Sequence, residues 1–112
     1  MTSGLPHGRE AILDIRKIED YCLNPSHPRG RHKARVFRDA LDLRQADAPW
    51  LRNAILNAAL VEEAVEIDTD ERGLHWRLDA TLRRHGKTAV VRTIWLVRAR
   101  ERVPRFVTCW VL

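Results

Sequence analysis

The chain has 112 residues, a formal net charge of +5 at pH 7 and a sequence pI near 10.0. This length fits one domain, residues 1–112, and is sufficient to bury a core without disulfides or metals. The sequence contains no run of about 20 apolar residues, the length that a membrane span needs, so we expect no membrane association. The positive charge favours a polyanionic partner such as RNA, DNA or an acidic protein.

The first sixty residues carry signals for helices. Residues 1–10 are predicted to be an irregular lead-in, because glycine and proline interrupt regular structure there. A short extended piece at 11–14 opens the helical part, which occupies residues 11–60. Apolar side chains recur at helical spacing in three stretches, which predicts helices over about 15–23, from 30 or 31 to 43, and from an Asp47 N-cap to about 60.

From residue 61 onwards the apolar residues follow the period of a strand. The alternation is cleanest from Leu74 to Leu82, and the dipeptide His85-Gly86 after it is typical of a tight hairpin turn. Antiparallel strands are predicted over 65–68, Leu74 to Leu82, 89–98 and 105–112. Helices followed by an antiparallel sheet of about four strands indicate an α+β fold, with two to three N-terminal helices covering one face of the sheet.

A two-residue turn would fix the register of the central hairpin. The predicted pairs are Trp76 with Trp95, Leu78 with Thr93, and Asp79 with Arg92. The two tryptophans would stack on the covered face, while the Asp79–Arg92 pair would lie on the open, positively charged face. The last strand is apolar on both sides, so alternation leaves its orientation open.

The sequence predicts neither a cofactor nor a metal. Cys22 and Cys109 lie far apart in the sequence and fit neither a metal spacing nor a disulfide framework, which favours a reducing, cytoplasmic setting. The chain has no glycine-rich nucleotide loop and no zinc-binding spacing. Residues 24–37, in contrast, gather arginine, lysine and two histidines around a Gly-Pro loop before a helix, a pattern suited to gripping phosphate.

Several short motifs resemble those of a small bacterial domain family of uncharacterised function. They span nearly the whole chain in this order: Leu5-Pro6, Tyr21 to Pro28 with Gly30, Lys33 to Phe37, Val91 to Trp95, and Pro104 to Thr108. The resemblance implies a domain that occurs alone, often beside a gene for a short acidic partner, and also at the C-terminal ends of phage head-morphogenesis and toxin-like proteins. The order of helices and strands is also similar to that of the barnase, EndoU, colicin and RelE group of metal-independent ribonucleases, although this chain has a third helical segment.

That architectural likeness implies a toxin-like endoribonuclease with an RNA substrate, kept silent by an acidic antitoxin or immunity-type partner. The predicted catalytic residues are Lys33, Arg35 and Arg92 as cations, with Thr93 and Thr108 as hydrogen-bond donors to phosphate. The predicted substrate-binding residues are His27, Arg31, His32 and Arg77. Either of the two histidines could act as acid or base near neutral pH.

These assignments leave structural alternatives open. Arg92 could serve only as the cross-strand partner of Asp79, and the two threonines could belong to the core. The rival function is a non-catalytic basic binding module for nucleic acid, phage assembly or an acidic protein, and a third option is an immunity-type protein. The ribonuclease hypothesis requires Lys33 and Arg92 to converge on one anion pocket.

Overall fold

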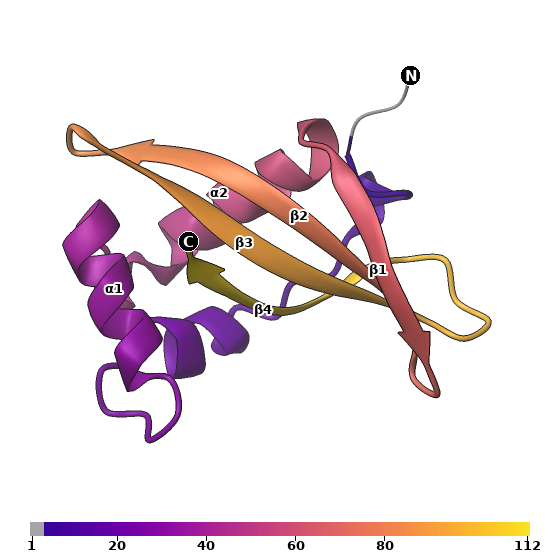
Figure 1. Ribbon diagram of the computed structural model, residues 1–112. Coiled ribbons are helices and arrows are strands. Elements are labelled where there is room, and N and C mark those ends of the chain that lie inside the picture. Colours follow the sequence, from indigo (N-terminus) through magenta and orange to yellow (C-terminus); the bar gives the residue numbers. More distant parts are fainter. Residues whose placement is uncertain (1–3) are drawn as a thin grey trace.

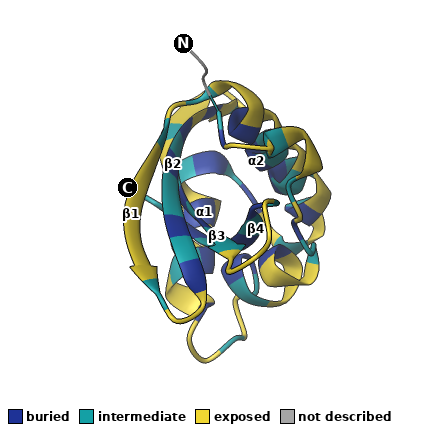
Figure 2. Cartoon of the chain, turned by 90° about the vertical axis from the view of Figure 1, so that its right-hand side faces the viewer, coloured by how far each residue is buried: buried dark blue, intermediate teal, exposed yellow. Residues whose placement is uncertain are grey.

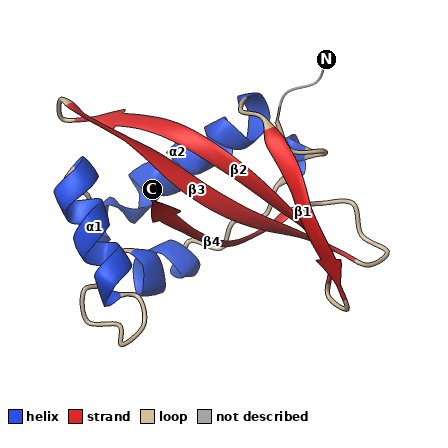
Figure 3. Cartoon of the chain, viewed as in Figure 1, coloured by secondary structure: helices blue, strands red, loops and turns tan. Residues whose placement is uncertain are grey.

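The structure, a computed structural model, describes residues 4–112 and shows helices followed by a four-stranded antiparallel sheet (Figures 1 and 3). Its elements are η1 (Gly8–Glu10), η2 (Ile18–Cys22), α1 (Arg31–Leu41), η3 (Gln45–Asp47), α2 (Ala48–Val61), β1 (Ala64–Asp70), β2 (Gly73–Arg84), β3 (Lys87–Arg98) and β4 (Arg105–Val111). The predicted α+β fold class is confirmed. Residues 1–3 of the predicted lead-in lie outside the described residues.

The two longer helices form close to where the apolar spacing predicts them. Ala34, Phe37 and Leu41 make up the buried stripe of α1. This helix ends two residues before its predicted end, because Asp42 adopts a left-handed conformation with φ of 54°. The Asp42 carboxylate lies 2.8 Å from Nδ1 of His85 in the β2–β3 turn, which ties the end of α1 to the sheet.

The first predicted helix is instead a short, widened turn. Asp14 accepts a hydrogen bond from the backbone N–H of Arg16 at 3.0 Å, much as an N-cap would. Further on, the N–H of Leu23 bonds the carbonyl of Ile18, five residues back, at 2.9 Å. This π-type hydrogen bonding widens η2 and allows Ile18, Cys22 and Leu23 all to be buried.

The sheet is a meander with the strand order β1-β2-β3-β4. The predicted register of its central hairpin is confirmed, with Trp76 opposite Trp95, Leu78 opposite Thr93, and Asp79 opposite Arg92. The turn has positive φ at both central residues, 50° at His85 and 74° at Gly86, which is the geometry of a type I′ turn.

A bulge in β4 settles the orientation that alternation left open. Trp95 pairs with Phe106 whereas Ile94 pairs with Thr108, so Val107 is the extra residue. Phe106 therefore faces the helices and is buried, while Thr108 lies on the opposite face.

The core lies between the sheet and the helices that cover one of its faces (Figure 1). Trp95 is fully buried there, and its ring meets that of Phe106 edge to face with centroids 5.5 Å apart. Trp76 is only half-buried, so the tryptophans are unequal partners rather than one buried stack. The edge strand β1 is exposed along most of its length (Figure 2). No helix among residues 4–112 is both long and apolar enough to cross a bilayer.

Candidate functional site

The side chain of Lys33 lies where the first turn of α1 meets β4. Its Nζ donates a hydrogen bond to Oγ1 of Thr108 at 2.9 Å. The same nitrogen lies 5.1 Å from the ring centroid of Tyr21 and 5.3 Å from that of Trp110, within the range of cation–π attraction. An ammonium carries three donors, and a single hydrogen bond to residues 4–112 engages it, so donors remain for a bound anion.

A small pocket opens beside this ammonium. It has a volume of about 410 Å³ and is lined by Lys17, Tyr21, Lys33, Val107 and Thr108, and we call it the Lys33 pocket. Among the residues described, its lining holds two lysines and no carboxylate, so its local charge is positive. A hydroxyl, a phenol and two ammonium groups around one concavity suit the oxygens of a phosphate.

The loop between η2 and α1 is fixed by its own hydrogen bonds, and it connects Tyr21 to the helix that carries Lys33. Asn24 accepts a hydrogen bond from the backbone N–H of Ser26 at 2.9 Å, and Nδ1 of His27 accepts bonds from the N–H groups of Arg29 and Gly30, both at 3.0 Å. Gly30 packs so closely on the Tyr21 carbonyl that a Cβ at this position would overlap its oxygen.

His27 therefore shapes the loop beneath the Lys33 pocket. Its ring also meets that of Tyr21 edge to face, with centroids 4.7 Å apart. Its Nδ1 is occupied by two backbone hydrogen bonds of the loop, and His27 does not line the Lys33 pocket.

Arg92 lies on the open face of the sheet and is already paired. Its Nε and Nη2 donate to the carboxylate of Asp79 at 2.9 and 3.0 Å, and this bidentate bond lowers the pKa of Asp79. Arg92 also stands opposite Trp110, whose ring lies below Lys33. Lys33 and Arg92 thus both lie beside Trp110. The carboxylate of Asp79 partly neutralises the charge of Arg92, so Arg92 attracts an anionic ligand less strongly than an unpaired arginine would.

Arg77 occupies the same open face, one row along the sheet. It pairs with Ile94, which in turn pairs with Thr108 of the Lys33 pocket. Arg77 is half-buried on β2, two strands away from β4, and does not line the Lys33 pocket. The structure therefore places this predicted substrate-binding residue on the same face as Thr108 but outside the pocket.

Thr93 has no place in the site. It is fully buried on the helix-covered face, where its hydroxyl donates to the carbonyl of Leu78 at 2.7 Å and accepts from Nε1 of Trp95 at 2.8 Å. A hydroxyl that is buried and engaged in both directions cannot reach a phosphate on the open face, so the predicted catalytic role of Thr93 is corrected to a core role.

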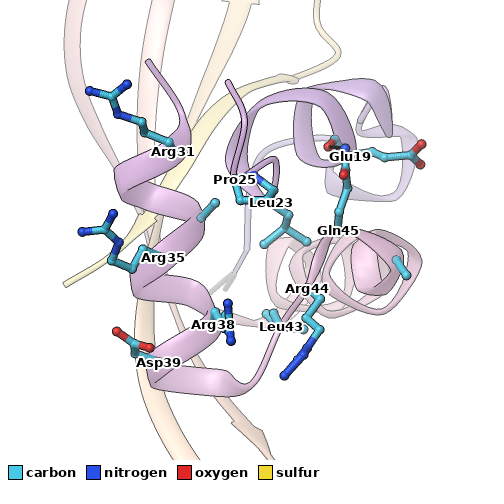
Figure 4. A pocket seen from close by; sticks show the side chains of 12 residues that line it. Glu19, Leu23, Pro25, Arg31, Arg35, Arg38, Asp39, Leu43, Arg44 and Gln45 are labelled. Carbon is cyan, nitrogen blue, oxygen red and sulfur yellow. Dashed lines mark hydrogen bonds between the residues drawn. The ribbon is translucent and has the colours of Figure 1, made fainter. Parts of the chain in front are cut away.

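Arg35 is separated from Lys33 by the body of α1. Residues two apart on a helix point about 200° from each other. Arg35 accordingly lines a different and larger cavity of about 870 Å³, together with Arg31 (Figure 4). His32 is exposed on the same helix and lines neither cavity. The predicted set of five catalytic residues thus divides between the Lys33 pocket, the open face, the core and this second cavity.

The comparison with protein-family models decides the family. Residues 4–112, nearly the whole chain, match the model of a domain of unknown function, DUF6883. The chain belongs to the DUF6883 family. Comparisons with curated proteins and with solved structures gave no match. The predicted resemblance to a domain family of unknown function is therefore confirmed, while the likeness to ribonuclease toxins stays a prediction.

Two cysteines lie directly behind the Lys33 pocket of this DUF6883 domain. Cys22 and Cys109 are 87 positions apart in the chain, yet their Sγ atoms are 3.8 Å apart and both are buried free thiols. The hydrogen bond from the Cys109 thiol lowers the pKa of Cys22 to about 7, whereas burial raises the pKa of Cys109. Sequence spacing gave no hint of this contact, because η2 and β4 meet only in the folded chain.

Three side chains of the site were missed by the sequence interpretation. Tyr21 and Trp110 flank the lysine ammonium, and Lys17 adds a second positive charge. Tyr21 does stand in one of the motifs on which the predicted family resemblance was based, but nothing in its surroundings pointed to a ligand. Trp110 could not be placed until the bulge in β4 fixed which face it occupies.

Proposed function

We propose that this protein is a toxin-type, metal-independent endoribonuclease whose phosphate-binding centre is the Lys33 pocket. The observation that carries the proposal is the geometry of Lys33, whose ammonium bonds Thr108 and lies over two aromatic rings. Cations fixed in advance stabilise the negative charge that develops on the phosphate oxygens in the transition state. Aromatic rings beside them suit single-stranded RNA, whose bases stack on such side chains.

The reaction that such a site would support is transesterification within RNA. The 2′-oxygen forms a bond to phosphorus and the bond from phosphorus to the 5′-oxygen breaks, which leaves a 2′,3′-cyclic phosphate and a 5′-hydroxyl. Water takes the proton of the 2′-hydroxyl, and the ammonium of Lys33 gives a proton to the departing 5′-oxygen. Solvent then returns a proton to the neutral amine of Lys33. Thr108 holds Lys33 in place and can donate its own hydrogen to a phosphate oxygen.

Binding without cleavage is the alternative function, and one observation favours it. Of the five predicted catalytic residues, only Lys33 and Thr108 are brought together in the Lys33 pocket. Arg92 is bonded to Asp79, so fewer cations face the phosphate than the ribonuclease hypothesis assumed. A basic module that binds single-stranded nucleic acid needs only the lysines and the aromatic rings.

The test is incubation of the purified protein with a labelled single-stranded RNA in the presence of a metal chelator, with products separated on a gel. We expect cleavage, and a rate lower by about 10²-fold or more for Lys33→Ala, because one preorganised charge in a catalytic site has about that effect. Thr108→Val should reduce the rate less. Arg98→Ala removes one exposed positive charge at the end of β3 and is the matched control.

The outcomes separate the two functions. RNA binding without product, weakened by Lys33→Ala and by added salt, would support the binding module and reject the enzyme. Cleavage that is equally fast in Lys33→Ala and in the control would place the active site elsewhere. Expression in a bacterial host adds a second readout, since growth arrest by the wild type but not by Lys33→Ala is expected of a toxin.

A further inference from the structure

A second basic cavity lies on the other side of α1 from the Lys33 pocket. Its volume of about 870 Å³ is twice that of the Lys33 pocket, and it runs between α1 and the segment that links α1 to α2 (Figure 4). We call it the arginine groove, with Leu23, Ala34 and Leu43 as its floor and Arg31, Arg35, Arg38 and Arg44 along its walls.

The four arginines of the groove are unengaged. All are exposed, and within residues 4–112 none of their guanidinium groups forms an ion pair or a hydrogen bond. Figure 4 shows Arg38 on the side of α1 that faces Leu43 and Arg44, whereas Arg31 and Arg35 project from the outer side of the helix. Positive charge is therefore brought to the two facing walls of the groove by Arg38 and Arg44, while Arg31 and Arg35 add charge along its outer rim.

The surface between these walls is aliphatic. Leu23 and Leu43 close the floor but are themselves only 2% and 1% exposed, so the apolar surface open to a partner comes from Pro25 and Ala46. The lining among the described residues includes no aromatic ring, so nucleobases would find no stacking platform of the kind that the Lys33 pocket has in Tyr21. This difference favours a polypeptide over RNA as the occupant.

Two carboxylates also line the groove. Glu19 and Asp39 are exposed among the arginines, and they would repel a ligand that is uniformly negative along its length. A partner with separate acidic and apolar positions can avoid them. An amphipathic helix meets these requirements when its apolar stripe lies against Pro25 and Ala46 and acidic residues flank the stripe on both sides.

We propose that the arginine groove is a docking site for an acidic amphipathic helix of a partner protein. The apolar stripe of that helix would contact the exposed Pro25 and Ala46. Its flanking carboxylates would pair with Arg38 on one wall and Arg44 on the other. This inference does not depend on the proposed ribonuclease activity, because the groove and the Lys33 pocket lie on different sides of α1.

The test uses a designed helical peptide of about five turns that carries leucines in one stripe and glutamates on both flanks. Binding to the full-length protein is measured by fluorescence anisotropy, and the site is mapped by amide chemical shifts. We expect saturable binding with shifts at Leu43 to Ala46 and along α1. The double variant Arg38→Glu/Arg44→Glu should weaken binding by at least about 30-fold, whereas Arg98→Glu/Arg100→Glu, with the same change in charge, should weaken it less than threefold.

A second peptide, with lysines in place of the glutamates, provides the decisive comparison. It should bind the Arg38→Glu/Arg44→Glu variant better than the wild type, a rescue that loss of folding could not produce. The proposal is overturned by any of three results: no saturable binding at about 100 µM peptide, equal weakening by both charge-reversal pairs, or a single-stranded RNA 12-mer that displaces the peptide and shifts the same groove amides.

Discussion

The two basic regions of the molecule differ in how their cations are held. In the Lys33 pocket the ammonium is fixed by Thr108, Tyr21 and Trp110, and the loop beneath it is held by hydrogen bonds of its own. In the arginine groove the guanidinium groups extend from exposed positions with no partner among residues 4–112. Positive charge is therefore held by neighbouring side chains in one region and extends into solvent in the other.

This difference suggests different tasks for the two regions. Preorganised charge suits a site where a particular oxygen must be met at a particular point, because no reorganisation is needed when the ligand arrives. Long, unpaired side chains suit recognition of a partner surface, where they raise the rate of encounter and adjust on contact. The net charge of the chain does not distinguish these two regions.

The largest expected change in stability comes from Gly30, and it tests whether the loop under the Lys33 pocket is rigid. Gly30→Ala would place a Cβ against the Tyr21 carbonyl oxygen, so the loop under the Lys33 pocket must shift. We expect a loss of about 1–3 kcal/mol in the free energy of unfolding, the usual range for overpacking. Urea denaturation measures it, with the exposed Ser26→Ala of the same loop as control, expected within about 0.5 kcal/mol of wild type. Equal stability of both variants would show that the loop does not hold the pocket rigidly.

A smaller effect tests the preorganisation of Lys33 itself. A double-mutant cycle with Lys33→Met and Thr108→Val should give a coupling free energy of about 0.5–1.5 kcal/mol, the net contribution of one hydrogen bond. The matched cycle across the groove, Arg38→Met with Arg44→Met, should give a coupling near zero, because no hydrogen bond or ion pair joins these two side chains among residues 4–112 and both are exposed to solvent. Chemical denaturation of the seven proteins, the wild type being common to both cycles, measures both values. Couplings of equal size would remove the distinction between the two regions.

Local signals in the sequence were sufficient for most of the fold. The alternation from Leu74 to Leu82 and the His85-Gly86 turn fixed the hairpin register to the residue, because a two-residue turn leaves one pairing. Helical spacing located α1 and α2 within a few residues. It failed at η2, where the hydrogen bond from Leu23 to Ile18 widens the turn, since apolar spacing does not distinguish an α-helix from a π-type turn over so few residues.

The candidate site was less accessible to sequence interpretation, because its parts come from distant elements. Lys33 and Thr108 were both named, but their contact spans 75 positions and depends on the bulge at Val107. His75 shows the same limit: nothing in its place in the alternating strand indicates that it is buried, or that its Nδ1 lies 3.0 Å from the carboxylate of Asp68 on β1. Contacts of this kind follow from strand order and packing, which residue types do not encode locally.

The smallest expected effect concerns Arg92, a cation that already has a partner. Its hydrogen bonds hold the pKa of the Asp79 carboxyl below the ordinary value of 3.8. A carboxyl with a lowered pKa in the folded state adds stability above its unfolded pKa and loses that contribution as pH falls. Asp79→Asn should thus destabilise the protein near pH 7 and converge with wild type in acid. Because the side chains of Arg92 and Asp79 are 28% and 34% exposed, we expect less than about 1 kcal/mol. Urea denaturation between about pH 2 and pH 7 measures it. A stability difference that stays constant over this range would mean that the carboxylate charge is not what holds Arg92, and that its guanidinium is as free as those of the arginine groove.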